Sequence, residues 1–370
     1  MNRGFQVVKS WVDTEVVALL GSMTYDQVSE QTGWSRGRIY NAALRAGARK
    51  TEERIAMRKQ ERDQLQKSLL QEMMNTTVKA DVLDFLAGMP DKSCRLVMTS
   101  PPYNLGKQYN QTGGQMDAMR FVYFHGWLQM ILSEVERVLV DGGTLCLQVG
   151  QTLDWSGSLY PMDVMLFEDL RRTGLQYKSR IVWHFGHGLT PKSRVAERYE
   201  TMLVLSKGEQ AVFNPNPGRT PQKEPGKRAF KGPNKGGLSG NPMGAAPTNV
   251  WAIPSIGSNN GEKTEHPCQF PLELARRAVL MYSMAGDLIC DPFSGSGTVQ
   301  EAAFRTGRGF IGADLFYEDV RSKRMQAARH DLVSTLPGVS DDSVAVWQAE
   351  ARKVERPARV ENEAVEWSLF

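Results

Sequence analysis

The chain has 370 residues, longer than one typical domain, so we expect one enzyme-sized domain with one or two small additions. Hydrophobic residues make up 41% of it, enough for a packed core, and the formal net charge of +4 by itself identifies no partner. No apolar run approaches the ~18 residues of a membrane span, and the N-terminus lacks the basic-then-apolar order of a signal peptide. We therefore expect a cytoplasmic protein without a membrane partner.

The cysteines and histidines do not predict a metal site. The four cysteines are far apart and include no C-x-x-C pair, so we interpret them as small buried hydrophobes in a reducing compartment. His184 and His187 fit a structural or substrate-lining role better than metal binding, because nothing else supplies a coordination set. The four cysteines are Cys94, Cys146, Cys268 and Cys290.

The first 50 residues predict a small helical unit. Residues 25–32 have the pattern of a short helix with Val28 facing inward, and Gly33 supplies a turn. Ser35 is a suitable N-cap for a second helix over residues 36–44. The highly charged residues 51–75 contain no Gly or Pro and predict a helical linker.

This helical pair is typical of a helix-turn-helix, whose second helix lies in the major groove of DNA. Ile39 would be on its buried side, and Arg36, Arg38 and Asn41 would face the DNA. The alternative is a helical hairpin with a basic surface.

Residues 76–333 show alternating strand and helix patterns, which indicate an α/β fold with a largely parallel sheet and helices on both faces. Asp141-Gly142-Gly143 is expected to end one of the helices. The tail, residues 334–370, has no chemistry that we can interpret. The expected strands are 95–99, 144–149, 177–183, 200–205, 287–290 and 309–313, and the expected helices are 119–140, 162–172, 271–283, 298–306 and 317–330.

Residues 207–250 interrupt this alternation of strands and helices. They are rich in Gly, Pro, Asn, Lys and Arg and have almost no apolar periodicity, so this long stretch without secondary structure should be functional or disordered. Its basic cluster indicates a phosphate-backbone partner, although such a run can also be a solvated face. The cluster comprises Arg219, Lys223, Lys227, Arg228, Lys231 and Lys235.

A glycine-rich motif follows the strand that ends near Cys290. Strand, tight loop and helix in succession are the layout of a nucleotide-type cofactor site, although a plain glycine turn has the same layout. Position 300 is Gln, so the motif is not the dinucleotide fingerprint. Asp314 ends the next strand, where an acid can bind both ribose hydroxyls. The motif residues are Asp291, Pro292, Phe293, Ser294, Gly295, Ser296, Gly297 and Thr298.

A second motif, Ser100-Pro101-Pro102-Tyr103, lies at the carboxyl end of a predicted strand. The exocyclic amine of adenine or cytosine is a poor nucleophile, because its lone pair is delocalised into the ring. Acceptors at Ser100 and at the Pro101 carbonyl can hydrogen-bond both N–H groups and redirect that lone pair, and the prolines hold the backbone in place. Tyr103 can stack on a base taken out of the helix. The alternative is that Pro-Pro merely ends a strand.

Together these motifs resemble the N6-adenine/N4-cytosine DNA methyltransferase family over residues 76–333. The resemblance implies a Rossmann-like S-adenosylmethionine fold, with the glycine motif binding the cofactor and the S-P-P-Y motif catalytic. His266 and Pro267 resemble the family's H-P-x-Q-x-P element, and Asp81 lies where the family has an acid near the cofactor adenine. The catalytic motif comes first, as in the permuted β group, where a segment such as 207–250 recognises the target.

The resemblance implies double-stranded DNA as partner, and leaves open a homodimer and a cognate restriction endonuclease. Serine at the first motif position, here Ser100, is commoner in cytosine-N4 enzymes, whereas the sequence after Tyr103 resembles that of adenine enzymes. We therefore favour adenine N6, with cytosine N4 as the alternative. Two other functions compete: a DNA-binding regulator with a degenerate methyltransferase fold, and a methyltransferase acting on RNA or on a protein amide. The latter enzymes place the cofactor motif first, whereas this chain places it last.

Overall fold

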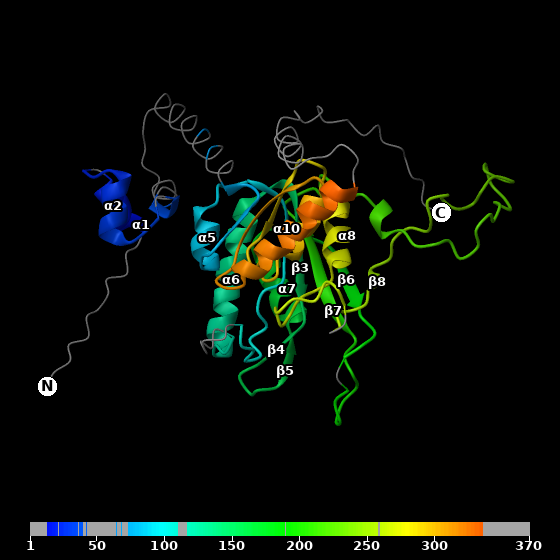
Figure 1. Ribbon diagram of the computed structural model, residues 1–370, viewed down its shortest axis with the longest axis horizontal. Helices are drawn as coiled ribbons and strands as arrows, with labels where there is room; N and C mark the ends of the chain where they lie inside the picture. Colours follow the sequence, from blue (N-terminus) through cyan, green and yellow to red (C-terminus); the bar gives the residue numbers. More distant parts are fainter. Residues whose placement is uncertain are drawn as a thin grey trace.

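The computed structural model describes residues 13–42 apart from 21, 36, 40 and 41, the single residues 64 and 68, and residues 73–335 apart from 110–116, 189 and 258–259. Arg36, Asn41, most of the predicted linker and nearly all of the tail therefore lie outside the described residues. The described residues form a small helical unit and an α/β domain (Figure 1).

The α/β domain is built on an eight-stranded sheet with the order β1-β10-β9-β2-β3-β7-β6-β8. The first five strands of this order are parallel, β7 is antiparallel to both β3 and β6, and β8 is parallel to β6. A separate hairpin pairs β4 (Gln151–Leu153) with β5 (Leu159–Pro161). The strands of the large sheet are β1 (Thr76–Val78), β2 (Cys94–Thr99), β3 (Leu139–Val149), β6 (Gln176–His184), β7 (Tyr199–Ser206), β8 (Val250–Ala252), β9 (Leu288–Asp291) and β10 (Gly309–Ala313).

Two hydrophobic clusters, one on each face of the sheet, hold the helices in place. In the fully buried strand β2, Val97 belongs to one cluster, whereas its neighbours Leu96 and Met98 belong to the other. The first cluster includes side chains of α5 (Val82–Gly88), α6 (Phe121–Val138) and α7 (Met162–Arg172). The second includes those of α8 (Leu272–Tyr282), α9 (Thr298–Arg305) and α10 (Glu318–Thr335). The predicted α/β fold with helices on both faces is confirmed.

One predicted boundary is wrong. Helix α6 ends at Val138, and the following Asp-Gly-Gly lies inside β3 instead of separating helix from strand. Gly142 has a φ of +74°, and a Cβ added to it would lie 2.7 Å from the Cβ of Ala211. Its backbone N–H donates to Lys207 and its carbonyl accepts from Ala211. The glycine therefore serves a close approach of the segment after β7, not a helix stop.

The N-terminal unit has the predicted helix and turn. Helices α1 (Asp13–Leu19) and α2 (Tyr25–Thr32) are followed by Gly33, which closes α2 in the left-handed conformation. Val28 and Ile39 are fully buried, as expected, and pack with Trp34. Ser35 Oγ accepts a hydrogen bond from the Arg38 backbone at 3.3 Å, which is the predicted N-cap contact. The role of this unit in DNA binding stays a prediction.

Residues 219–245, which we call the arm, project from the side of the domain (Figure 1). After a short 3-10 turn, Asn216–Gly218, bridges pair Thr220 with Ala245 and Arg228 with Leu238. The segment is therefore a loosely paired ribbon, and apart from the 3-10 turn and these bridges, residues 207–249 contain no helix or strand. Side chains from 221 to 243 are exposed or half-buried, so the ribbon has no core of its own.

Candidate functional site

The two sequence motifs meet at one edge of the sheet. Strands β2 and β9 are parallel neighbours, so Ser100 and Pro292 both follow strands that end at this edge. Thr99 Oγ1 donates a hydrogen bond to Asp291 Oδ1 at 2.7 Å, which links the two motifs directly although 192 residues separate them. This edge, at the carboxyl ends of the parallel strands, is where open α/β sheets bind ligands.

A cavity of about 990 Å³ occupies this edge and is lined by both motifs. Its size lies at the upper end of the range for small-molecule sites. Of the predicted cofactor residues, Pro267, Asp291 and Gly297 are not among its lining residues. The predicted residues that line it are Asp81, Ser100, Pro101, Pro102, Tyr103, His266, Pro292, Phe293, Ser294, Gly295, Ser296, Thr298 and Asp314.

The glycine loop is held by two carboxylates, one within the motif and one directly after β10. Asp291 Oδ1 accepts from the backbone N–H of Phe293 at 3.1 Å, and Asp314 Oδ2 accepts from that of Gly295 at 2.8 Å. Burial raises the pKa of Asp291 to about 7. Asp81 caps α5 by accepting from the backbone of Leu83 and also lines the cavity.

Glycine at position 295 has two structural reasons. Its φ is +46°, which disfavours any side chain, and an added Cβ would lie 2.9 Å from Nε2 of His266. His266 also makes an edge-to-face contact with Tyr317, with ring centroids 4.6 Å apart. Burial lowers the pKa of His266 to about 4, so its ring is neutral at pH 7. The H-P-x-Q element thus packs directly on the glycine loop.

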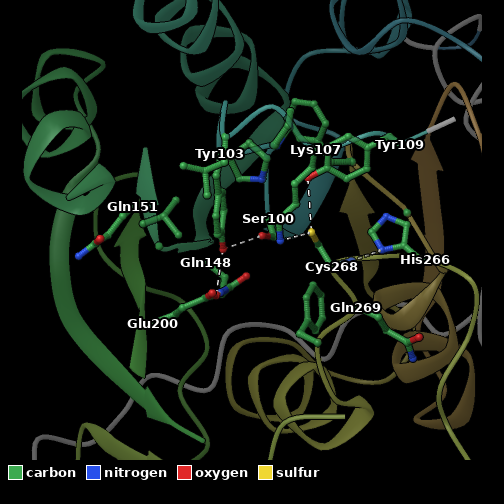
Figure 2. A pocket seen from close by; sticks show the side chains of 18 of the residues that line it. Ser100, Tyr103, Lys107, Tyr109, Gln148, Gln151, Glu200, His266, Cys268 and Gln269 are labelled. Carbon is green, nitrogen blue, oxygen red and sulfur yellow. Dashed lines mark hydrogen bonds between the residues drawn. The ribbon is translucent and has the colours of Figure 1, made fainter. Parts of the chain in front are cut away.

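Sequence reasoning missed two polar residues behind the catalytic motif. The Tyr103 hydroxyl donates to Glu200 Oε2 at 3.0 Å and lies 3.2 Å from Ser100 Oγ, and Gln148 Nε2 also donates to Glu200 (Figure 2). Burial raises the pKa of Glu200 above its ordinary value and that of Tyr103 well above its own. The sequence signal was available, because Gln148 and Glu200 are polar residues within the apolar strands β3 and β7.

A third missed residue, Asp117, shapes the backbone after the motif. Its carboxylate accepts hydrogen bonds from the backbone N–H groups of Asn104, Leu105 and Lys107. Asn104 has a φ of +57° and its side chain bonds both backbone groups of Met119. Asp117 therefore anchors the loop that leads away from the catalytic residues.

Cys268 corrects one expectation. Cys94, Cys146 and Cys290 are buried as predicted, but Cys268 is half-exposed and lines the cavity. Its Sγ lies 3.1 Å from Nζ of Lys107 (Figure 2). It follows His266 by two residues, so the turn that holds the histidine also brings this thiol into the wall.

None of the predicted DNA-binding residues that the structure describes is among the cavity-lining residues. On the arm, the Arg219 guanidinium bonds Asn216 Oδ1 and the Gly244 carbonyl, and Lys227 pairs with Glu224 at 2.9 Å. The guanidinium of Arg38, in the N-terminal unit, stacks 4.1 Å above the ring of Trp34. The loop between β6 and β7, residues 185–198, lines the cavity instead. Sequence reasoning had considered only its His187, which is not among the lining residues. The cavity-lining residues of this loop are Phe185, Gly188, Thr190, Pro191, Arg194 and Glu197.

Two further observations concern the described residues alone. Their histidine, cysteine and acidic side chains contain no group arranged to hold a metal ion. None of their helices combines the length and the apolar character of a membrane crossing.

Comparison with known proteins identifies the family. The DNA methylase family of N6 and N4 enzymes matches residues 94–322. The chain is 36% identical over 247 residues to the type II methyltransferase M.BglII of Bacillus subtilis, spanning 67% of each chain. It is 31% identical over 263 residues to the DNA adenine methyltransferase YhdJ of Escherichia coli, spanning 69% of this chain and 84% of that one. Its fold is similar to that of the PvuII cytosine-N4-specific DNA methyltransferase, with a TM-score of 0.50 and 19% identity over 76% of this chain and 95% of that one. The chain therefore belongs to the N6/N4 DNA methylase family and is a site-specific DNA methyltransferase.

Proposed function

We propose that this enzyme transfers the methyl group of S-adenosylmethionine to N6 of an adenine in double-stranded DNA. One observation carries the proposal: a single cavity is lined by the glycine loop and by the S-P-P-Y motif. A methyl donor held by the first and an amine held by the second would therefore share one chamber. The similarity to a DNA adenine methyltransferase supports adenine as the target.

The residues on and around the glycine loop fit the cofactor. The acids Asp81 and Asp314 line the cavity, which suits a ligand with ribose hydroxyls and cationic groups. Phe293 lines it too and packs against Trp127 with ring centroids 5.6 Å apart, giving an apolar wall for an adenine ring. When bound, S-adenosylmethionine supplies an electrophilic methyl group on a sulfonium.

The S-P-P-Y motif would hold the target base. Ser100 Oγ and the Pro101 carbonyl accept hydrogen bonds from the two amine N–H groups, which turns the nitrogen lone pair out of the ring. The Tyr103 ring, fixed at its hydroxyl by Glu200, offers a face for a base taken out of the duplex. These residues act by orientation and preorganised electrostatics.

DNA would approach the mouth of the cavity. We assign phosphate contacts to the basic residues of the arm and an accessory role to the N-terminal residues Arg36, Arg38 and Asn41. We assign a further DNA contact to the loop 185–198, because its Arg194 lines the cavity and Lys192 lies two residues before it in the sequence. DNA binding would thus be shared between the arm and the wall of the cavity.

The second candidate is cytosine N4, favoured by Ser100 at the first motif position. The test is expression in a methylation-free host followed by modification-resolved sequencing of its DNA. We expect N6-methyladenine at one recognition sequence, and far less of it with the Ser100→Ala variant. N4-methylcytosine would establish the second candidate. If the host accumulates folded protein that binds DNA but its DNA stays unmodified, the result would favour the DNA-binding regulator instead.

A further inference from the structure

A chain of hydrogen bonds runs from the catalytic serine into the protein. Ser100 Oγ lies 3.2 Å from the Tyr103 hydroxyl, which donates to Glu200 Oε2 at 3.0 Å. Gln148 Nε2 donates to the same carboxylate oxygen. Figure 2 shows Ser100, Tyr103 and Glu200 pointing toward one another. Glu200 lies in β7 and Gln148 in its neighbour β3, so the end of this chain is fixed by two paired strands.

The number of protons available determines which group donates in each of these hydrogen bonds. An ionised carboxylate only accepts hydrogen bonds, so the single hydroxyl proton of Tyr103 is engaged in the hydrogen bond that it donates to Glu200. Burial raises the pKa of Tyr103 well above its ordinary value, so the phenol keeps that proton. Toward Ser100 the phenol then presents only oxygen lone pairs. Ser100 must donate its own proton to Tyr103, which leaves the lone pairs of Ser100 Oγ to face the cavity.

We propose that Glu200 is a positioning residue that, through Tyr103, makes Ser100 a pure hydrogen-bond acceptor for the target amine. This inference rests on the proposed function. A serine hydroxyl by itself can donate as well as accept, and a hydroxyl proton aimed at the amine would oppose the orientation that the reaction needs. With its proton committed to Tyr103, the serine acts toward the amine as a carboxylate would. The hydroxyl of Tyr103 thereby has a function that its ring alone does not supply.

The same reasoning predicts the pH dependence. A protonated Glu200 could donate to Tyr103 and release the phenol proton toward Ser100. Burial raises the pKa of Glu200, and Glu197 adds to this, whereas the hydrogen bonds from Tyr103 and Gln148 and the charge of Lys107 oppose it. The active form is ionised, so the methylation rate falls as the pH drops through this raised pKa.

The test is a comparison of Tyr103→Phe in three backgrounds, measuring kcat at saturating DNA and S-adenosylmethionine. With Ser100 in place, we expect Tyr103→Phe to lower kcat at least about tenfold, equivalent to one lost oriented hydrogen bond, with unchanged cofactor affinity. In the Ser100→Asp enzyme, whose carboxylate needs no orienting partner, the same change should cost less than about threefold. In the Ser100→Ala enzyme the effect should also vanish, which keeps the test decisive if Ser100→Asp is inactive.

A pH profile separates this role from a purely structural one. Glu200→Gln keeps the shape of the side chain but cannot ionise, so the acid limb of the wild-type profile should disappear. An equal loss from Tyr103→Phe in every background, or an acid limb unchanged in Glu200→Gln, would overturn the inference. Both outcomes presuppose that the wild-type enzyme methylates DNA. Wild-type inactivity would refute the proposed function instead.

Discussion

Gly295→Ala is the sharpest probe of the cofactor loop. The residue has a φ of +46°, and the added Cβ would lie 2.9 Å from Nε2 of His266, a distance that real Cβ atoms do not tolerate. Either the loop or the histidine must therefore move. Both line the cavity, so the movement reaches the site where the cofactor is expected to bind.

Two contributions give the size of the effect. A left-handed backbone costs a non-glycine residue roughly 1–2 kcal/mol, and relieving the clash with His266 costs about 1–3 kcal/mol, as for other overpacked sites. The backbone cost lowers the free energy of unfolding wherever a glycine in the left-handed conformation is replaced. The clash with His266 disfavours the arrangement of loop and histidine that binds the ligand. It corresponds to roughly 5- to 150-fold weaker binding of S-adenosylmethionine.

Gly174 supplies the matched control. It has a φ of +90° with open space around it and is not among the cavity-lining residues. Gly174→Ala should lower the free energy of unfolding by a similar backbone contribution without changing cofactor affinity. The assays are calorimetric titration with S-adenosylmethionine and chemical unfolding of both variants. Wild-type affinity in Gly295→Ala, or equal weakening in Gly174→Ala, would refute the reasoning.

Three other predictions follow from the site. Ser100→Ala should lower the methylation rate about 10²–10³-fold while calorimetry shows unchanged cofactor affinity; an equal rate would refute its assignment. Neutralising Lys227, Arg228 and Lys231 should weaken DNA binding and flatten its salt dependence by up to about 0.9 log unit per lost phosphate contact, and normal methylation at raised salt would leave the arm as a solvated ribbon. Burial raises the pKa of Asp291 to about 7, so its folded form binds a proton that the unfolded chain releases near pH 4. Wild-type stability should therefore fall relative to Asp291→Asn as the pH rises from 4 to 7; a constant difference in unfolding free energy would contradict this.

The sequence by itself determined the class of fold and its chemistry. Buried strands such as β2 and β7 and amphipathic helices such as α8 have patterns that depend on neighbours along the chain, and these were predicted correctly. The glycine loop and the S-P-P-Y motif are each a continuous stretch of sequence. Their composition therefore indicated a cofactor loop and an amine-binding wall. Short elements such as β1 and α5 have too few residues to show periodicity and were missed.

Only the tertiary structure decided which distant residues share the site. Gln148 and Glu200 lie 52 residues apart, and their hydrogen bond exists because β3 and β7 are paired. The contact of His266 with Gly295 likewise depends on how two separate segments pack. The same holds for the arm, whose basic composition predicted a charged surface but not that none of its predicted DNA-binding residues lines the cavity. Local patterns report local backbone preferences, whereas these contacts come from strand order and loop packing, which neighbouring residues do not encode.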